Sequence, residues 1–323
     1  MADVFSTTTS GLGSNLVTMA YDKLIEINLR NTPQFRAIAD KKVGNPTHDG
    51  SSIRFQFHND IADTTIAGAT LAETVDPDAV ALPATTTLDV SQVELGRVVL
   101  PTRKLSLMSL ADVDPWIANA VSFNMAMTLD AGIAAVLDAG TNVIRESAGA
   151  LSTSAAKTTI VGTDTLKGRD IRYAVTKLRA NNVLTRGGMY TAYVHPEVSH
   201  DLRTETGNNI WRTPNEYQNI NALYAGEIGA WEGVRFIETP TMTNTQSGSG
   251  TGGTQVRVYN SYVLGQQALA EAVWKEPGIE FGNVVDKLNR FRPVGWHGII
   301  NWAVFRQAAL YRIETASSVR PNA

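Results

Sequence analysis

The stretch DPWIANAVSFNMAMTLDAGIAAVLDAG, residues 114–140, decides the fold class of this chain. Asp114 is placed to cap a helix, and Pro115 occupies the first turn, where a missing N–H costs nothing. Gly140 is the expected C-terminal stop. A helix of roughly 25 residues is about 37 Å long, so the pattern predicts a structural spine. Apolar residues at helical spacing form its expected buried face: Ile117, Val121, Met125, Leu129, Ile133, Val136 and Leu137.

Upstream of this helix the periodicity changes to that of strands. Ile53, Phe55 and Phe57 alternate with polar residues, which is typical of a strand with one buried face. A second strand-like run covers residues 85–100, and its alternation slips by one residue near the middle, which favours a bulge or bend. The segment between the runs is weakly apolar. The predicted hairpin, residues 43–104, therefore has no core of its own and should lie on another part of the protein.

The remaining segments predict further helices and strands, and together they indicate an α+β fold. A short amphipathic helix is expected over 21–29, within a polar N-terminal arm, and a small-residue connector over 141–163. Asp164 or Thr165 should cap a second helix that buries one apolar face. The other expected elements are strands at 189–194, 233–238 and 256–264, a Pro-initiated helix at 195–203, a flexible loop at 243–254 and an alternating C-terminal run at 299–313.

One glycine pattern resembles a nucleotide-binding fingerprint. Gly248, Gly250 and Gly253 fit G-x-G-x-x-G, and Glu271 follows at a distance suited to binding a ribose. The fingerprint requires a strand before the glycines and a helix after them. Here a polar stretch precedes the glycines and a strand-like run, 255–259, follows them. The pattern therefore indicates a flexible loop.

A second group of residues resembles a metal site. His195 and His200 lie five residues apart, with Glu197 and Asp201 between and beside them. Ligands on one helix face need a spacing of four, and a proline directly after the first histidine disturbs the geometry further. A strand-to-helix corner with ordinary polar side chains fits better. No catalytic, cofactor-binding or metal-binding residue is therefore assigned.

Basic residues on the second helix have two interpretations. A solvated helix face is the first, and a contact with neighbouring subunits or with packaged DNA is the alternative. These residues are Arg169, Arg172, Lys177 and Arg179.

Composition limits the classes of protein that fit. Of 323 residues, 43% are hydrophobic, which supports a packed core, while only 18% are charged. The usual charged share is about 25%. A neutral surface suits a subunit that buries much of that surface against neighbours. The net charge of −3 gives no sign of a nucleic-acid-binding domain, and the absence of cysteine excludes disulfides. No secretory signal is apparent, and no apolar run approaching the roughly 20 residues of a membrane span is expected.

Four segments carry a resemblance to a known family: DAGIAAVLDAGTNV (130–143), YVHPEVSHDLR (193–203), YAGEIGAWEGVRFIET (224–239) and FRQAALYRIET (305–315). These segments, and the order of the parts, resemble the major capsid proteins of tailed bacteriophages, in particular a podovirus and siphovirus subfamily. That family shares its fold with encapsulin shells and the floor of herpesvirus capsids.

The resemblance implies a self-assembling, non-enzymatic shell subunit that forms hexamers and pentamers of an icosahedral head enclosing double-stranded DNA. It also implies five ranges: an N-terminal arm (1–42), an extended hairpin loop (43–104), a peripheral domain with the spine (105–164), an axial domain (165–272) and a peripheral C-terminal return (273–323). An encapsulin-like cargo shell is the alternative within the fold. An enzyme that uses the glycine-rich loop is the alternative from another class.

The same resemblance implies partners and a location. The expected partners are further copies of the chain, a portal protein at one vertex, a decoration protein and, through non-specific contacts, packaged DNA; no membrane is expected. Because only 42 residues precede the first turn cluster, a separate scaffolding protein is favoured over a fused scaffolding segment. The expected location is the virion, after assembly in the cytoplasm of the bacterial host.

Overall fold

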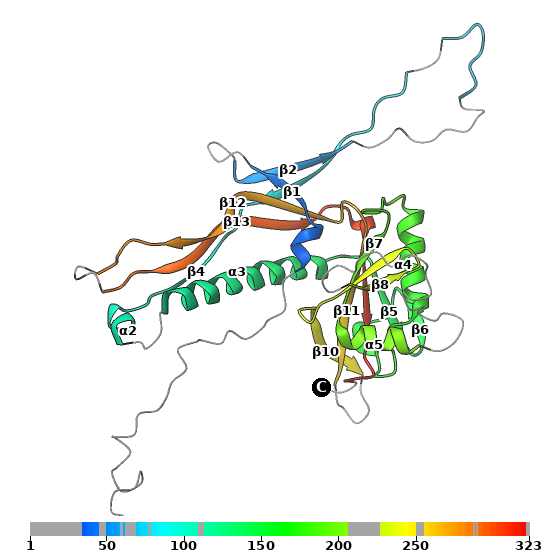
Figure 1. Cartoon of the computed structure of the whole chain (residues 1–323). Helices are drawn as coiled ribbons and strands as arrows, with labels where there is room; N and C mark the ends of the chain where they lie inside the picture. The colour runs from blue at the N-terminus through cyan, green and yellow to red at the C-terminus, as the bar shows by residue number, and fades with distance from the viewer. Residues whose placement is uncertain are drawn as a thin grey trace, which may run out of the picture.

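The chain forms a long twisted sheet lined by one helix, with a compact unit of strands and helices at one end (Figure 1). The computed structural model describes residues 34–44, 50–58, 61, 69–76, 79–108, 113–205, 227–249, 255–286, 288 and 290–320. Helices and strands are interspersed, as the α+β prediction required. The helix expected over 21–29 lies outside the described residues.

Helices occur between the strands. They are α2 (Arg103–Met108), α3 (Val113–Asp138), α4 (Gly168–Ala180) and α5 (Pro196–Thr204), with 3₁₀ turns η1 (Phe35–Ile38), η2 (Lys157–Thr159) and η5 (Gln307–Ala309).

The strands in the described part of the chain form three sheets. A four-stranded sheet has the order β1 (Asp40–Val43), β12 (Leu269–Phe281), β13 (Val294–Val304), β4 (Glu94–Val99), and a two-stranded sheet pairs β2 (Ser52–Phe57) with β3 (Thr86–Ser91). An eight-stranded sheet has the order β6 (Ala150–Ser152), β5 (Val143–Ser147), β14 (Leu310–Thr315), β11 (Gln255–Leu264), β7 (Tyr190–Val194), β9 (Val234–Glu238), β8 (Glu227–Trp231), with β10 (Asn244–Ser249) paired to β11.

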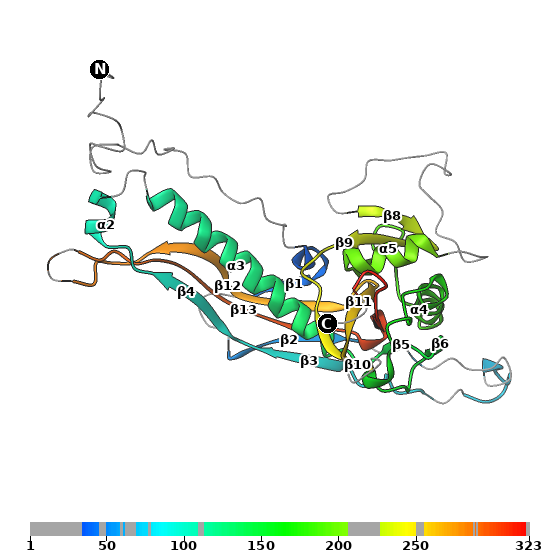
Figure 2. The same cartoon turned by 90° about the horizontal axis from the view of Figure 1, so that it is seen from below.

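The predicted spine is confirmed as α3, a helix of 26 residues. Five of the seven predicted apolar residues are fully buried, and the other two are half-buried. Pro115 lies in the first turn as expected, but the cap predicted at Asp114 is wrong, because the helix already includes Val113. Helix α3 runs along the four-stranded sheet (Figure 2). Gly132 lets the two elements approach, since a Cβ there would lie 2.8 Å from Cζ3 of Trp302.

The apolar character of α3 corrects one expectation from the sequence. Trp116–Asp138 is long and apolar enough to cross a membrane, by length and composition only. The core helix of a protein can meet the same criterion, and one face of α3 is buried within this protein. Asp130 accepts a hydrogen bond from the backbone N–H of Phe35 at 2.9 Å, and Asp138 accepts one from the Tyr262 hydroxyl at 2.6 Å. Both carboxyls are thus partnered within the protein.

The predicted hairpin is confirmed in its first half. Strands β2 and β3 pair antiparallel, with Ile53 opposite Val90, and pack these residues and Phe55 on Ala270 and Ala272 of β12. The hairpin thus lies on another part of the protein, as its lack of a core indicated. The run 85–100 is not one strand, because the chain leaves β3 at the predicted slip and enters β4, which pairs with β13.

The sheets do not follow the boundaries of the five expected ranges. Strand β4, placed in the hairpin range, belongs to the four-stranded sheet, and β14, placed in the peripheral return, pairs with β11 and β5 in the eight-stranded sheet. The expected break at 272/273 falls inside β12. Backbone pairing between segments distant in sequence produces these differences, and local periodicity carries no information on such pairing.

The compact unit confirms most of the expected elements. Ile171, Ala174, Val175 and Leu178 of α4 are buried as predicted. The cap assignment is wrong: α4 begins at Gly168, and Asp164 instead accepts hydrogen bonds from the backbone N–H groups of Ala148, Gly149 and Val161. The 141–163 connector contains β5 and β6. Strand β5 of this segment pairs with β14. The small side chains of the segment show no periodicity from which a strand could be predicted.

Candidate assembly surfaces

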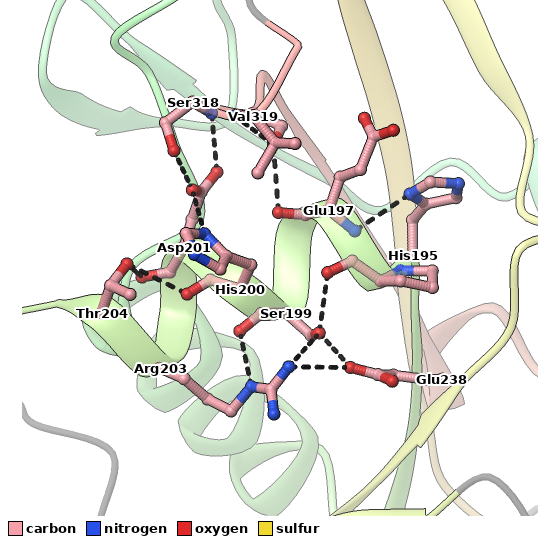
Figure 3. Close-up of polar contacts among 12 residues, drawn as sticks. His195, Glu197, Ser199, His200, Asp201, Arg203, Thr204, Glu238, Ser318 and Val319 are labelled. Atoms are coloured by element: carbon pink, nitrogen blue, oxygen red, sulfur yellow. Dashed lines mark hydrogen bonds and ion pairs between the residues drawn. The ribbon is translucent and has the colours of Figure 1, made fainter.

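The strand-to-helix corner at α5 holds the histidine and carboxylate group seen in the sequence (Figure 3). His195 caps the helix, because its Nδ1 accepts a hydrogen bond from the backbone N–H of Glu197 at 3.2 Å. Burial lowers the pKa of His195, so the neutral ring that this cap requires is favoured. Burial, reinforced by a hydrogen bond to Glu197, raises the pKa of Tyr259 to about 12. The corner is therefore a cap and a packing site.

Asp201, on the same helix, fixes the C-terminal segment. Its buried carboxylate accepts hydrogen bonds from the backbone N–H of Ser318, at 2.9 Å, and from the Ser318 hydroxyl (Figure 3). The Ser317 hydroxyl donates to the backbone carbonyl of Glu197 at 3.0 Å. His200 is mostly exposed. Within the described part of the chain, no group of three or more His, Asp or Glu side chains could hold a metal ion.

The glycine-rich pattern does not have the geometry of a nucleotide site in the residues that can be described. Gly248 lies on β10, opposite Val256 of β11 in an antiparallel pair, while Gly250 and Gly253 lie outside the described residues. The expectation of a loop over all of 243–254 is therefore wrong for 244–249, because backbone pairing with β11 orders a polar sequence. The strand predicted to follow the glycines is confirmed.

Glu271, the residue that the fingerprint would place on a ribose, has a structural role. Its buried carboxylate binds the guanidinium of Arg36 at 2.8 Å and the indole N–H of Trp302 at 3.0 Å. Arg36 also pairs with Glu276 at 2.5 Å. These contacts attach the chain before β1 to the four-stranded sheet.

The basic face of α4 is largely solvated, as its first interpretation held. Arg172, Lys177 and Arg179 are exposed, and Arg172 pairs with Glu232 at 2.9 Å. Arg169 turns inward and pairs with the buried Glu146.

Exposed apolar side chains gather in two places, and the first is the hairpin loop, defined here as residues 58–85. Its described part exposes large apolar side chains, with Leu82 at 80% of its full accessible area. Isolated exposed apolar residues are ordinary, but contiguous sets mark interaction sites. The exposed members are Ile61, Leu71, Val75, Val80 and Leu82.

The second place is the sheet tip, defined here as residues 97–108 and 279–292. Helix α2 is joined to the β12–β13 turn there, because the backbone N–H of Arg103 donates to the carbonyl of Arg290 at 2.9 Å. Leu107 is 77% exposed. Periodicity in the sequence did not predict this surface, although Leu105, Leu107 and Met108 make three of the six residues Arg103–Met108 apolar. Its exposed apolar members are Val98, Val99, Leu100, Leu105, Leu107, Met108, Ile279, Phe281, Val284, Val285 and Leu288.

Comparison with known proteins identifies the family. A family model described as phage capsid protein matches residues 117–306, more than half of the chain. The chain belongs to the phage capsid protein family. No curated protein sequence matches it.

Solved phage capsids have the same fold as this capsid protein. The capsid of Ralstonia phage GP4 matches with a TM-score of 0.73 and 14% identity, covering 97% of this chain and 98% of that one. The capsid of cyanophage Pam1 matches with a TM-score of 0.71 and 14% identity, over 98% and 100% of the two chains. A chain of Mycobacterium phage Che8 gives 0.66 and 15%, over 93% and 98%.

Family membership and the shared fold define the general role. The protein is a structural subunit, a major capsid protein that forms the phage head shell, and the virion capsid is its location. The encapsulin-like alternative is not favoured, because the matching family model is that of phage capsids.

Proposed function

We propose that copies of this capsid protein join as hexamers and pentamers that close an icosahedral shell around the double-stranded DNA genome. The compact unit built on the eight-stranded sheet would surround the axis of each ring, as the axial domain. Helix α3 and the four-stranded sheet would form the peripheral domain between rings. The hairpin loop would extend over an adjacent subunit.

The position of the exposed apolar residues carries this proposal. Most of those described lie in the hairpin loop and the sheet tip, the two projecting parts of an elongated molecule (Figures 1 and 2). Exposed apolar side chains that gather in particular parts of a molecule mark interaction sites more often than scattered ones do. Subunit contacts at both projections would remove these side chains from water, at roughly 25 cal/mol per Å² buried.

Expression of the chain followed by sedimentation and negative-stain microscopy tests the proposal. We expect closed or partly closed shells with visible hexameric and pentameric rings. As a control, a variant with residues 62–84 replaced by a short Gly-Ser linker should stay folded and remain unassembled. Exclusively monomeric wild-type protein, alone and with the neighbouring phage genes, would contradict the proposal. Particles filled with a protein cargo would instead support the encapsulin-like alternative.

The proposal assigns no catalytic, cofactor-binding or metal-binding residue. The carboxylates of the α5 corner and Glu271 are engaged in caps, tail contacts and ion pairs, which supports a structural role for them. Incubation of the purified protein with nucleotides should give no binding at the glycine-rich segment.

We also propose a separate scaffolding protein as a transient partner, with a portal protein at one vertex, a decoration protein outside and non-specific contacts to packaged DNA. A shell of one repeated subunit can close with several symmetries, because its contacts differ little in energy. An additional protein that selects one curvature resolves that ambiguity.

A further inference from the structure

One lysine of the compact unit directs its amine at the side-chain amide of a buried asparagine. Nζ of Lys157, on η2, donates a hydrogen bond to Oδ1 of Asn260, on β11, at 3.3 Å. Asn260 is only 4% exposed. The two residues are 103 positions apart in the sequence, so folding alone brings them together. Holding an amine against an amide replaces an encounter in solution with a step inside one molecule.

The amide of Asn260 is fixed with its carbonyl toward the lysine. Its Nδ2 donates to the carboxylate of Asp138 at 2.6 Å and to the hydroxyl of Thr243 at 3.0 Å. A carboxylate only accepts hydrogen bonds and an ammonium only donates them. The amide therefore cannot turn over, because its oxygen would then face the Asp138 carboxylate and its NH₂ group would face the amine of Lys157.

The charges around the amine favour its neutral, nucleophilic form. The buried carboxylate of Glu314 lies 3.8 Å from Nζ of Lys157 and also pairs with Arg145 and Arg312. Together with Asp138, the cluster holds three basic side chains and two carboxylates. Arginine keeps its proton in proteins, so the lysine is the group that can release one. Burial lowers the pKa of Lys157, and the positive charges of the two arginines act in the same direction.

We propose that Lys157 and Asn260 join in an isopeptide bond that forms within the folded subunit without another enzyme. Glu314 accepts a proton from Lys157, and the free amine attacks Cγ of Asn260. The bond between Cγ and Nδ2 breaks, and the departing nitrogen takes up the two protons that Nζ gives up in all. One lysine ammonium and one asparagine amide thus become one new amide and one ammonium ion. The step needs no oxidant, reductant or cofactor.

The bond would fasten an edge of the eight-stranded sheet to its interior. Lys157 follows β6, the edge strand, and Asn260 lies on β11, between β14 and β7. A cross-link that closes a loop of 103 residues restricts the unfolded chain, as a disulfide does. The chain has no cysteine for a disulfide. Because both residues belong to one subunit, this inference goes beyond the proposed function and does not depend on assembly.

Mass spectrometry of the purified full chain tests the bond. The variant Lys157→Arg keeps the positive charge but has no nucleophilic amine. After correction for the substitution, wild-type protein should be lighter than this variant by the mass of one ammonia molecule. The matched control is Lys167→Arg, at a lysine of the same unit that pairs with the buried Glu146 at 2.8 Å, and it should keep the wild-type loss.

Peptide mapping of the wild-type protein locates the bond independently of any variant. Trypsin cleaves after free lysine, so the bond after Lys157 should stay uncut. A branched peptide that joins Lys157 to Asn260 should appear in most molecules, both from unassembled subunits and from particles.

Two results would overturn the inference. The first is wild-type protein with free Lys157 and no branched peptide. The second is an ammonia loss that persists in Lys157→Arg, because cyclisation of an asparagine on its own backbone gives the same mass change. Particles that form without the bond would leave the proposed function in place, and the bond in protein that never assembles would leave this inference in place.

Discussion

At the scale of single residues, the buried carboxyl of Asp170 gives the subunit a specific dependence on pH. Burial and then the nearby Glu146 raise its pKa from 3.8 to about 7. The folded state therefore binds the proton more tightly than the unfolded state, and stability falls as pH rises between about 4 and 7. Asp170→Asn should remove this loss and stabilise the unassembled subunit at pH 8 by on the order of 2–4 kcal/mol.

Thermal unfolding at pH 5 and pH 8 measures this effect. The gain in thermal midpoint of the variant over wild type should be larger at pH 8 than at pH 5, where only part of the loss has occurred. Asp76→Asn, at an exposed carboxylate, is the control and should shift the midpoint equally at both values. A destabilised Asp170→Asn protein at pH 8 would show that the ionised carboxylate is required, contrary to this expectation.

Leu129 is a second residue with a measurable role, in the buried face of α3. Leu129→Ala removes buried methyl groups and leaves a cavity, so we expect a loss of about 2–5 kcal/mol in the free energy of unfolding. Denaturant titration of the unassembled subunit measures it. Asn119→Ala, exposed on the same helix, should change stability by no more than about 0.5 kcal/mol. Similar values for the two variants would contradict the core placement of this helix face.

At the scale of elements, the β2–β3 hairpin is attached to its own subunit by a small cluster, Ile53, Phe55 and Val90 on two alanines of β12. The loop beyond it has exposed apolar residues and no comparable cluster among its described residues. Limited proteolysis should therefore cut between residues 62 and 84 in unassembled protein and at least ten-fold more slowly in particles. Equal cleavage rates in both forms would exclude a contact between subunits at the loop.

At the scale of the whole molecule, two projecting surfaces on one elongated subunit specify neighbours but not the size of the shell. We expect the chain expressed alone to give irregular, undersized or open assemblies. Co-expression with one neighbouring phage gene should give uniform shells, because a scaffolding protein selects a single curvature. Electron microscopy of both preparations measures particle diameter. Uniform shells of virion size from the chain alone would contradict the need for a scaffolding protein.

The sequence by itself determined the elements that depend on local periodicity. The spine helix, the α4 face and the β2 alternation each follow from side chains that repeat at 3.6 or 2 residues, so one apolar face must be buried. It also showed that His195 and His200 lacked the spacing of metal ligands. The caps expected at Asp114 and Asp164 failed, because the ends of a helix depend on contacts that periodicity does not encode.

Only the tertiary structure decided how those elements combine. Pairing of β4 with β13 and of β14 with β11 joins segments far apart in the chain, and hydrogen bonds between backbones carry no sequence signature. Antiparallel pairing with β11 forms β10 in a glycine-rich stretch whose composition predicted a loop. The sheet tip appeared only when α2 and the β12–β13 turn came together, because a surface formed by two distant segments exists only after folding.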